Sequence, residues 1–148
     1  MVAPIPRELR CVVVTPEKAL VDTPADFVSL PMYDGALGVL PGRAPLIGRL
    51  GFGELEIRHG GQKQRYFVDG GFVQVAGGAV TVLTPRALKP EEIKPAAVTQ
   101  ALEAARVAQA DAHTPEAQDA NLKVMERARV QLRMVARREE AQGGHGHG

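Results

Sequence analysis

Short runs of alternating polar and apolar residues occupy the first 88 positions of the chain. Residues 54–59 show the pattern most clearly, with Leu55 and Ile57 standing between charged neighbours. Alternation with a period of two is typical of a strand that buries one face and exposes the other. Comparable runs lie at residues 9–15, 26–30, 65–69, 72–75 and 80–83. Their spacing predicts an antiparallel β-sandwich or barrel.

Glycine pairs mark the turns expected between these runs. The pairs stand at residues 60–61, 70–71 and 77–78, each directly after an apolar run. Because glycine adopts a positive φ without steric cost, we expect a hairpin turn at each pair. Residues 34–46 contain further glycines and prolines but are unusually apolar for a loop. They predict a tight connector at the surface, which is either a contact site or a corner of the sandwich.

Alanine replaces glycine after about residue 90, and the apolar positions take the period of a helix. Pro95 suits the first turn of one helix, and Thr114 followed by Pro115 predicts the start of a second. The first apolar stripe is Val98, Leu102, Ala105, Ala108 and Ala112. The second is Ala117, Val124, Ala128, Leu132 and Val135. Both stripes are thin, so we expect a helical hairpin of marginal stability by itself.

These two patterns predict an α+β chain built in two parts. An N-terminal antiparallel β-sandwich over residues 1–88 is followed by a C-terminal antiparallel α-helical hairpin over residues 89–140. Residues 141–148 are rich in glycine and cannot contribute to a core. We therefore expect them to form a disordered, solvated tail.

Composition narrows the functional classes. The 148 residues carry 18 basic and 17 acidic side chains, a balance that predicts no bulk attraction to nucleic acid or to an anionic membrane. Cys11 is the one cysteine, which excludes an internal disulfide framework and a zinc site of paired cysteines. The sequence offers no P-loop and no recognisable catalytic constellation. We therefore expect no catalytic residues, no cofactor and no metal ion.

Basic side chains gather on the second predicted helix. They are Lys123, Arg127, Arg129, Arg133, Arg137 and Arg138, with Glu126 the only acid among them. Arg129, Arg133 and Arg137 are spaced by four residues and therefore line one side of a helix. This face is either simply solvated or docks against an acidic partner, where its charge would set orientation and association rate. Nucleic acid is a weaker alternative, because no aromatic side chains are interleaved with the basic ones.

Several blocks of the sequence together resemble the epsilon subunit of F-type ATP synthase, whose mitochondrial counterpart is called delta. The blocks lie at residues 13–16, 35–46, 50–53, 67–75 and 80–83. The most specific are the G-x-L-P-G-x-A-P-L segment that ends at Leu46 and the G-G-F-x-x-V segment that begins at Gly70. The resemblance covers nearly the whole chain in the family's order.

This resemblance implies a non-catalytic rotor subunit in the central stalk of a proton-translocating ATP synthase. Such a subunit binds the gamma subunit, rests on the membrane ring of c subunits, and couples ring rotation to ATP synthesis. Arg43 lies at the position that approaches gamma in the family. The residues implied to approach the c-ring are Tyr33, Asp34, Gly35, Ala36 and Leu37.

The resemblance also gives the helical hairpin a role. In the family the hairpin folds down on the sandwich or extends along gamma toward the catalytic alpha and beta subunits, and in some relatives the extended form blocks ATP hydrolysis. A few kcal/mol would switch such an equilibrium. The side chains implied to face acidic residues of beta are Lys123, Arg127, Arg129, Arg133 and Arg137.

Two positions depart from the family pattern. Arg43 stands where the family usually has histidine, so the charge of the gamma contact differs. Some members bind ATP through the pattern Ile/Leu-Asp-x-x-Arg-Ala, which corresponds here to residues 93–98. Lys94 replaces the aspartate and Ala97 replaces the arginine, so we expect no ATP binding.

The sequence also predicts where the chain works. Its apolar runs are far shorter than the about 18 residues of a membrane span, and its N-terminus does not resemble a signal peptide. We therefore expect a peripheral subunit on the cytoplasmic face of the bacterial inner membrane, or on the stromal face of the thylakoid membrane in a plastid. The alternative is a stand-alone β-sandwich binding module with a helical hairpin that docks a partner.

Overall fold

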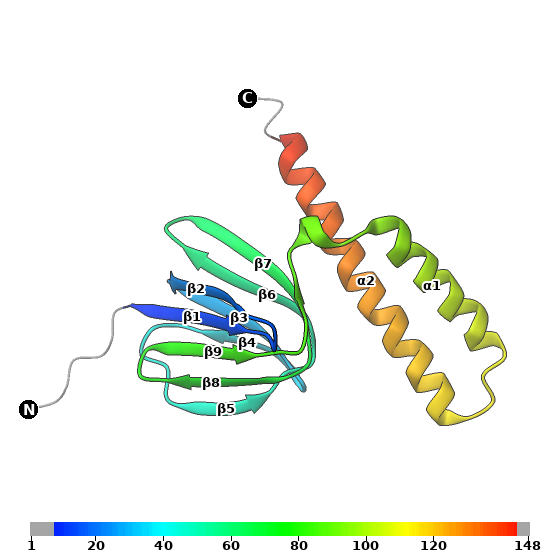
Figure 1. Cartoon of the computed structure of the whole chain (residues 1–148), viewed down its shortest axis with the longest axis horizontal. Coiled ribbons are helices and arrows are strands. Elements are labelled where there is room, and N and C mark those ends of the chain that lie inside the picture. The colour runs from blue at the N-terminus through cyan, green and yellow to red at the C-terminus, as the bar shows by residue number, and fades with distance from the viewer. Residues whose placement is uncertain (1–7, 145–148) are drawn as a thin grey trace, which may run out of the picture. The chain divides into compact units, whose positions relative to one another are not determined.

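The computed structural model describes residues 8–144, with side chains described up to Glu140 (Figure 1). The chain divides into two compact units that meet between Leu88 and Lys89. The first unit contains only strands, and the second contains only helices. This arrangement agrees with the α+β class and with the β-sandwich and helical hairpin that the sequence predicts.

The first unit is a sandwich of two five-stranded sheets, called here sheet A and sheet B. Sheet A has the strand order β2-β1-β9-β8-β5, and sheet B has the order β10-β7-β6-β3-β4. Sheet A consists of β1 (Leu9–Val14), β2 (Ala19–Ala25), β5 (Leu46–Arg49), β8 (Phe72–Ala76) and β9 (Ala79–Leu83). Sheet B consists of β3 (Phe27–Met32), β4 (Gly35–Val39), β6 (Phe52–His59), β7 (Gln62–Asp69) and β10 (Ala87–Leu88).

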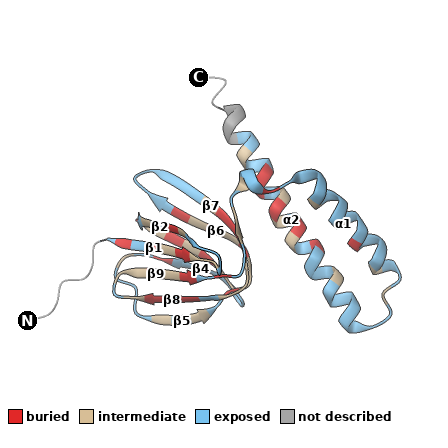
Figure 2. Ribbon diagram, in the orientation of Figure 1, coloured by how far each residue is buried: buried red, intermediate tan, exposed pale blue. Residues whose placement is uncertain are grey.

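Neighbouring strands are antiparallel with one exception among the described strand pairs, since β1 and β9 run parallel. The sandwich core takes alternate residues of most strands, and the buried positions are red in Figure 2. Val13, Leu30, Leu55 and Val82 are all fully buried there. The period-two pattern of the sequence therefore identifies the buried face correctly in these strands.

Four strands lie outside the runs that alternation predicts: β2, β4, β5 and β10. The expected connector at residues 34–46 is wrong in part, because β4 occupies residues 35–39 and pairs with β3 from Met32 opposite Gly35 to Val28 opposite Val39. Both β4 and β5 are edge strands. Their small and glycine residues weaken the strand signal, and pairing with a long neighbour holds them in place.

Two of the three predicted glycine turns are hairpins. The turns at residues 60–61 and 77–78 join β6 to β7 and β8 to β9, with all four glycines at positive φ. The expected hairpin at residues 70–71 is wrong, because β7 belongs to sheet B and β8 to sheet A. Gly71 has φ 108°, and an added Cβ there would meet the carbonyl oxygen of Leu83. This pair therefore forms a corner through which the chain changes sheets.

A second change of sheet meets the first at this corner. The chain passes from β5 to β6 through residues 50–51, and Leu50 N–H donates to the Gly71 carbonyl at 2.9 Å. Gly70 N–H in turn donates to the Gly51 carbonyl at 2.9 Å, and Gly51 N–H donates to the Pro31 carbonyl at 2.9 Å. These backbone bonds hold both crossings against the end of β3.

The second unit is a pair of helices that lie side by side, α1 (Pro95–Ala110) and α2 (Pro115–Gly144), preceded by a short 3-10 turn, η1 (Pro90–Glu92) (Figure 1). The predicted start of the second helix is confirmed, since Thr114 Oγ1 accepts the N–H of Ala117 at 3.1 Å. Helix α2 continues to Gly144, four residues beyond the expected hairpin end, and the rest of the expected tail, residues 145–148, lies outside the described residues.

The faces that the two helices bury differ in part from the predicted stripes. Ala108 on α1 and Val124 on α2 are exposed, and the neighbouring Gln109 and Met125 turn inward instead. A shift of one residue rotates a side chain by about 100° around the helix. Ala117 is exposed, and Gln131 and Met134 are buried although neither was predicted. Counting only aliphatic residues therefore missed the long flexible side chains that are buried in this unit.

Substitutions at Gly71 in the corner and at Gly60 in a hairpin turn give a matched test of the corner. We expect Gly71→Ala to lower the free energy of unfolding by at least about 3 kcal/mol, because strain at positive φ adds to a clash with backbone atoms. Gly60→Ala has open space around its Cβ and should cost only about 1 kcal/mol. Urea unfolding measures both, followed by the combined fluorescence of the exposed Tyr33 and the buried Tyr66. Equal losses would contradict the role of the corner.

Candidate interaction surfaces

The Tyr33–Asp34 position forms the tip of a tight hairpin between β3 and β4. Both residues lie in the two-residue turn, while Gly35, Ala36 and Leu37 belong to β4 itself. The structure therefore brings the five predicted c-ring residues together, but as a hairpin tip rather than a loop. Tyr33 is 70% exposed, although its ring lies under the guanidinium of Arg49, whose central carbon is 4.7 Å from the ring centroid.

The outer face of sheet A carries exposed apolar side chains on neighbouring strands. Ile47 on β5 is 79% exposed, Phe72 on β8 is 57% exposed and Leu83 on β9 is 52% exposed. Phe72 lies opposite both Arg49 and Leu83 in the strand register, so these three side chains form a row across the sheet. Exposed apolar groups gathered on one face are typical of a surface that another protein covers.

Period-two alternation does not predict this apolar face, because alternation implies polar residues on the outer side of each strand. Phe72 and Val73 are adjacent apolar residues at the start of β8, so this end of the strand is apolar on both faces. The signal available in the sequence was this doubling of apolar residues in an otherwise alternating run. Such doubling indicates a strand with a second covered face.

Arg43 follows a tight turn at the end of β4. Its N–H donates to the Leu40 carbonyl at 3.2 Å, which closes a turn with Pro41 and Gly42 at its centre. Gly42 has φ 85°, the conformation that a type II turn needs at this position. Arg43 and Leu40 are both exposed, so this turn is a second surface feature, at the opposite end of β4 from the hairpin tip.

The basic side chains predicted on α2 differ in their exposure. Lys123, Arg129, Arg133 and Arg137 are exposed, while Arg127 and Arg138 are half-buried. Lys123 Nζ forms an ion pair with Asp119 at 3.0 Å, one turn earlier on the same helix. The side chains at positions 129, 133 and 137 repeat every four residues and therefore extend along one side of α2.

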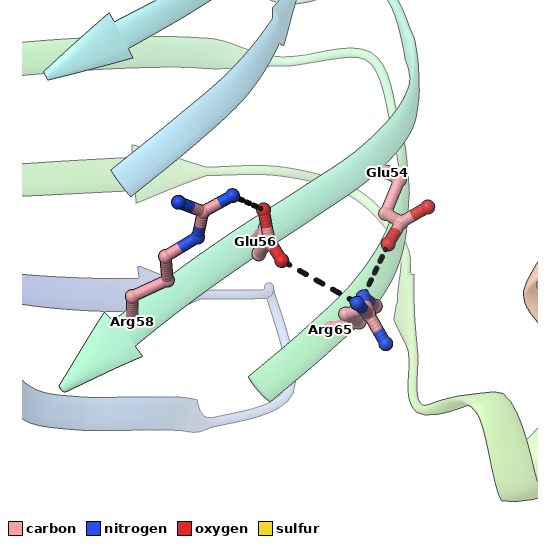
Figure 3. Close-up of polar contacts among 4 residues, drawn as sticks. All are labelled: Glu54, Glu56, Arg58 and Arg65. Carbon is pink, nitrogen blue, oxygen red and sulfur yellow. Dashed lines mark hydrogen bonds and ion pairs between the residues drawn. The ribbon is translucent and has the colours of Figure 1, made fainter. Parts of the chain in front are cut away.

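Charged side chains on the outer face of sheet B form a ladder with one another. Arg65 Nε lies 2.9 Å from Glu54, and Arg65 also reaches Glu56 at 3.5 Å (Figure 3). Glu56 pairs with Arg58 at 3.2 Å, and the Arg58 guanidinium stacks over Phe27 at 4.9 Å. These four charged side chains are thus matched within sheet B, in contrast to the exposed apolar side chains of sheet A.

The residues aligned with the ATP-binding pattern lie at the beginning of α1. Ile93 is buried, Lys94 is the residue before the first helical turn, and Ala97 is exposed one turn later. Neither position carries a side chain of the charge that the pattern requires. That this chain does not bind ATP stays a prediction.

Groups able to perform chemistry are scarce in the described part of the chain. Within residues 8–144 no cluster of three histidine, cysteine or acidic side chains has the geometry to hold a metal ion. Burial raises the pKa of the Cys11 thiol to about 12, which keeps it protonated at neutral pH. Neither described helix combines the length and the apolarity needed to cross a membrane.

Comparisons with known proteins decide the family. Residues 8–90 match the family described as ATP synthase, Delta/Epsilon chain, beta-sandwich domain. The ATP synthase epsilon chain of Rhodopirellula baltica is 48% identical over 125 residues, which cover 84% of this chain and 96% of that one. The chain belongs to the ATP synthase epsilon chain family. The epsilon chain of Symbiobacterium thermophilum is 38% identical over 104 residues, 70% of this chain and 73% of the relative.

Solved structures agree with this assignment. A chain in the structure of the Euglena gracilis mitochondrial ATP synthase, with OSCP, F1 and the c-ring, has a TM-score of 0.77 and 26% identity, covering 88% of this chain and 84% of its own length. A chain of the Tetrahymena thermophila central stalk and c-ring structure has a TM-score of 0.60 at 13% identity, covering 86% of this chain and 96% of its own length, which shows a shared fold.

The epsilon chain is thus a non-catalytic rotor subunit in the central stalk of ATP synthase, a membrane-associated complex. This confirms the family and the non-catalytic role that the sequence blocks implied. Surfaces for binding other subunits, rather than a reaction centre, are therefore the functional features to look for in this chain.

The buried thiol yields a simple test of the sandwich core. At pH 8 we expect a disulfide reagent such as DTNB to modify Cys11 at least about 100-fold more slowly in the native chain than in urea, because the raised pKa and the burial both remove reactive thiolate. Cys11 is the single cysteine, so the absorbance change reports this site alone. Similar rates in both conditions would show that β1 opens readily.

Proposed function

We propose that this epsilon chain connects the c-ring to the gamma subunit within the rotor, and that its helical hairpin restrains ATP hydrolysis. The observation that carries the first part is the apolar row on sheet A, with Phe72 and Leu83 exposed beside Arg49. A rotor subunit without catalytic groups transmits torque only through the surfaces that bind its neighbours. The sandwich provides two such surfaces, one on sheet A and one at the hairpin tip of β3 and β4.

Gamma is the partner that suits the outer face of sheet A. Ile47, Phe72 and Leu83 expose aliphatic and aromatic groups that gain free energy when a partner removes them from water, about 25 cal/mol for each Å². A permanently assembled rotor calls for an apolar interface of this kind, since obligate interfaces are more hydrophobic than transient ones. Arg43, in the exposed turn after β4, supplies a polar contact to gamma in the same proposal.

The c-ring is the partner proposed for the Tyr33–Asp34 turn. A hairpin tip with an exposed aromatic ring and an exposed carboxylate can reach polar loops on the surface of a ring. Gly35, Ala36 and Leu37 continue the same segment as the edge strand β4. In this arrangement the chain lies at the membrane surface, on the cytoplasmic side in a bacterium or the stromal side in a plastid, without entering the lipid.

The helical hairpin is proposed to act on the catalytic alpha and beta subunits. Ala105 is the single buried residue of α1, so α1 loses little buried area when it leaves α2 and the unit can exchange partners at modest cost. The exposed arginines of α2, together with Lys123 and Arg127, are suited to acidic residues of beta. Hydrolysis would be inhibited when this basic face occupies the catalytic head.

Charge removal on α2 tests the inhibitory role. The assay adds either chain to a catalytic complex that has been depleted of epsilon. With the combined variant Arg129→Ala, Arg133→Ala and Arg137→Ala, we expect ATP hydrolysis about 3- to 10-fold faster than with the unaltered chain. The physical reason is the loss of attraction to the acidic partner. Hydrolysis is measured at saturating amounts of each full-length chain.

The matched control is Arg106→Ala on α1. Arg106 is also an exposed helical arginine, but it is paired with Glu103 on its own helix at 3.5 Å. Its removal should leave the hydrolysis rate within a factor of about two. If the triple variant restrains hydrolysis as strongly as the unaltered chain, the basic face is not the inhibitory element.

A further inference from the structure

Arg49 lies between the two proposed docking surfaces, the outer face of sheet A and the hairpin tip of β3 and β4. It is the last residue of β5 and lies opposite Phe72 in the strand register, while Phe72 lies opposite Leu83. Its guanidinium therefore borders the apolar row of sheet A. On its other side the guanidinium covers the ring of Tyr33, with 4.7 Å between its central carbon and the ring centroid.

The backbone fixes this stack from below. Tyr33 N–H donates to the Arg49 carbonyl at 2.9 Å, and Met32 forms a bridge with Leu50 immediately beside it. The terminal methyl group of Met32 lies where a Cβ at Gly48 would stand, so the Met32 side chain packs directly against the Gly48 backbone. The guanidinium and the ring are thus held together by residues that belong to both sheets.

Within residues 8–140 no ion pair joins Arg49 to a carboxylate, and the same holds for Arg43 and Arg86. Three other arginines of the sandwich are paired with acidic side chains. Arg10 pairs with Asp22, Arg58 pairs with Glu56, and Arg65 pairs with both Glu54 and Glu56. Arg49 is exposed and contacts a ring face instead. Stacking on a ring occupies one face of the guanidinium plane and leaves its in-plane N–H donors directed outward.

We propose that Arg49 binds a carboxylate of the gamma subunit, with Tyr33 as the positioning residue that holds the guanidinium in place. This inference rests on the proposed docking of gamma on the outer face of sheet A. A planar guanidinium recognises a carboxylate with two parallel hydrogen bonds, and the adjoining apolar side chains exclude water from that contact. The result is a single charged anchor at the edge of an apolar interface.

The stack also joins the two partners of the rotor mechanically. Tyr33 stands in the turn proposed for the c-ring, and Arg49 stands in the face proposed for gamma. A load on the turn is then transmitted to the gamma contact through the hydrogen bond from Tyr33 N–H to the Arg49 carbonyl and through the stacked ring. The sandwich needs no movement of its own for this coupling.

The test is a titration of epsilon-depleted catalytic complex, which contains gamma but no c-ring, with the full-length chain at low and high salt. We expect Arg49→Gln to weaken binding about 10- to 30-fold at low salt, and to flatten the salt dependence of Kd, because a charge pair is lost. Arg49→Lys should recover only part of the affinity, since an ammonium lacks the planar fork.

Arg58→Gln is the matched control. Arg58 is likewise an exposed strand arginine stacked on an aromatic ring, but it lies on sheet B and is paired with Glu56. We expect its replacement to change Kd by less than about twofold, with the salt dependence unchanged. A loss as large as that of Arg49→Gln would show that general charge, rather than the position of Arg49, governs binding.

Because the titrated complex has no c-ring, the titration reports how Tyr33 positions Arg49 and not its proposed contact with the c-ring. Tyr33→Phe keeps the ring and should bind like the unaltered chain, whereas Tyr33→Leu should weaken binding about 3- to 5-fold. In the double variant with Arg49→Gln, Tyr33→Leu should have no further effect, because it acts through the arginine. Additive losses would overturn the positioning role.

Ile47→Ser and Phe72→Ser distinguish failure of this inference from failure of the proposed docking face. If these variants weaken binding while Arg49→Gln leaves Kd unchanged at both salt concentrations, the apolar face stands and the carboxylate anchor is wrong. If neither the apolar variants nor Arg49→Gln changes binding, gamma docks elsewhere and the proposed function is wrong in this part. Native circular dichroism confirms that each exposed substitution leaves the fold intact.

Discussion

The corner at residues 50–51 and 70–71 is the constraint on which the functional surfaces depend. Leu50, Gly51, Gly70 and Gly71 exchange backbone hydrogen bonds where the chain crosses twice between the sheets, and Gly51 also bonds to the end of β3. Satisfying these buried backbone groups at one place leaves little freedom to the segments that leave it. The corner thereby sets the positions of the Tyr33 turn, of Arg49 and of Phe72 together.

The packing of the two units suits them to different functions. The sandwich has a continuous core and a corner tied by backbone bonds, which suits a part that carries load between subunits. The helical hairpin has a thin interface, with Ala105 and Ala128 among its buried residues and the Gln109 Oε1 atom buried without a hydrogen-bond partner. Such an interface is weak enough to be exchanged for another, which suits the proposed regulatory role.

Alternation in the sequence was sufficient for strands with one polar face, such as residues 54–59, and helical periodicity with Thr114 as a cap was sufficient for the hairpin. Alternation failed for β4 and β5, because their place depends on partners in the fold rather than on their own residues. It located the strand at residues 72–75 but did not predict that Phe72 is exposed on its outer face. The corner at Gly71 looked like a hairpin because glycine pairs suit both. The resemblance to the family supplied Tyr33 and Arg43, whereas Arg49 emerged only from the geometry.

The most direct measurement is hydroxyl-radical footprinting of the full-length chain, free and bound to a catalytic complex that contains gamma, with oxidation of each side chain read by mass spectrometry. The account predicts that Ile47, Phe72 and Leu83 lose their reactivity on binding, while His59, exposed at the far end of β6, keeps its reactivity. Unchanged oxidation of Phe72 and Leu83 in the bound chain would contradict the docking of gamma on sheet A.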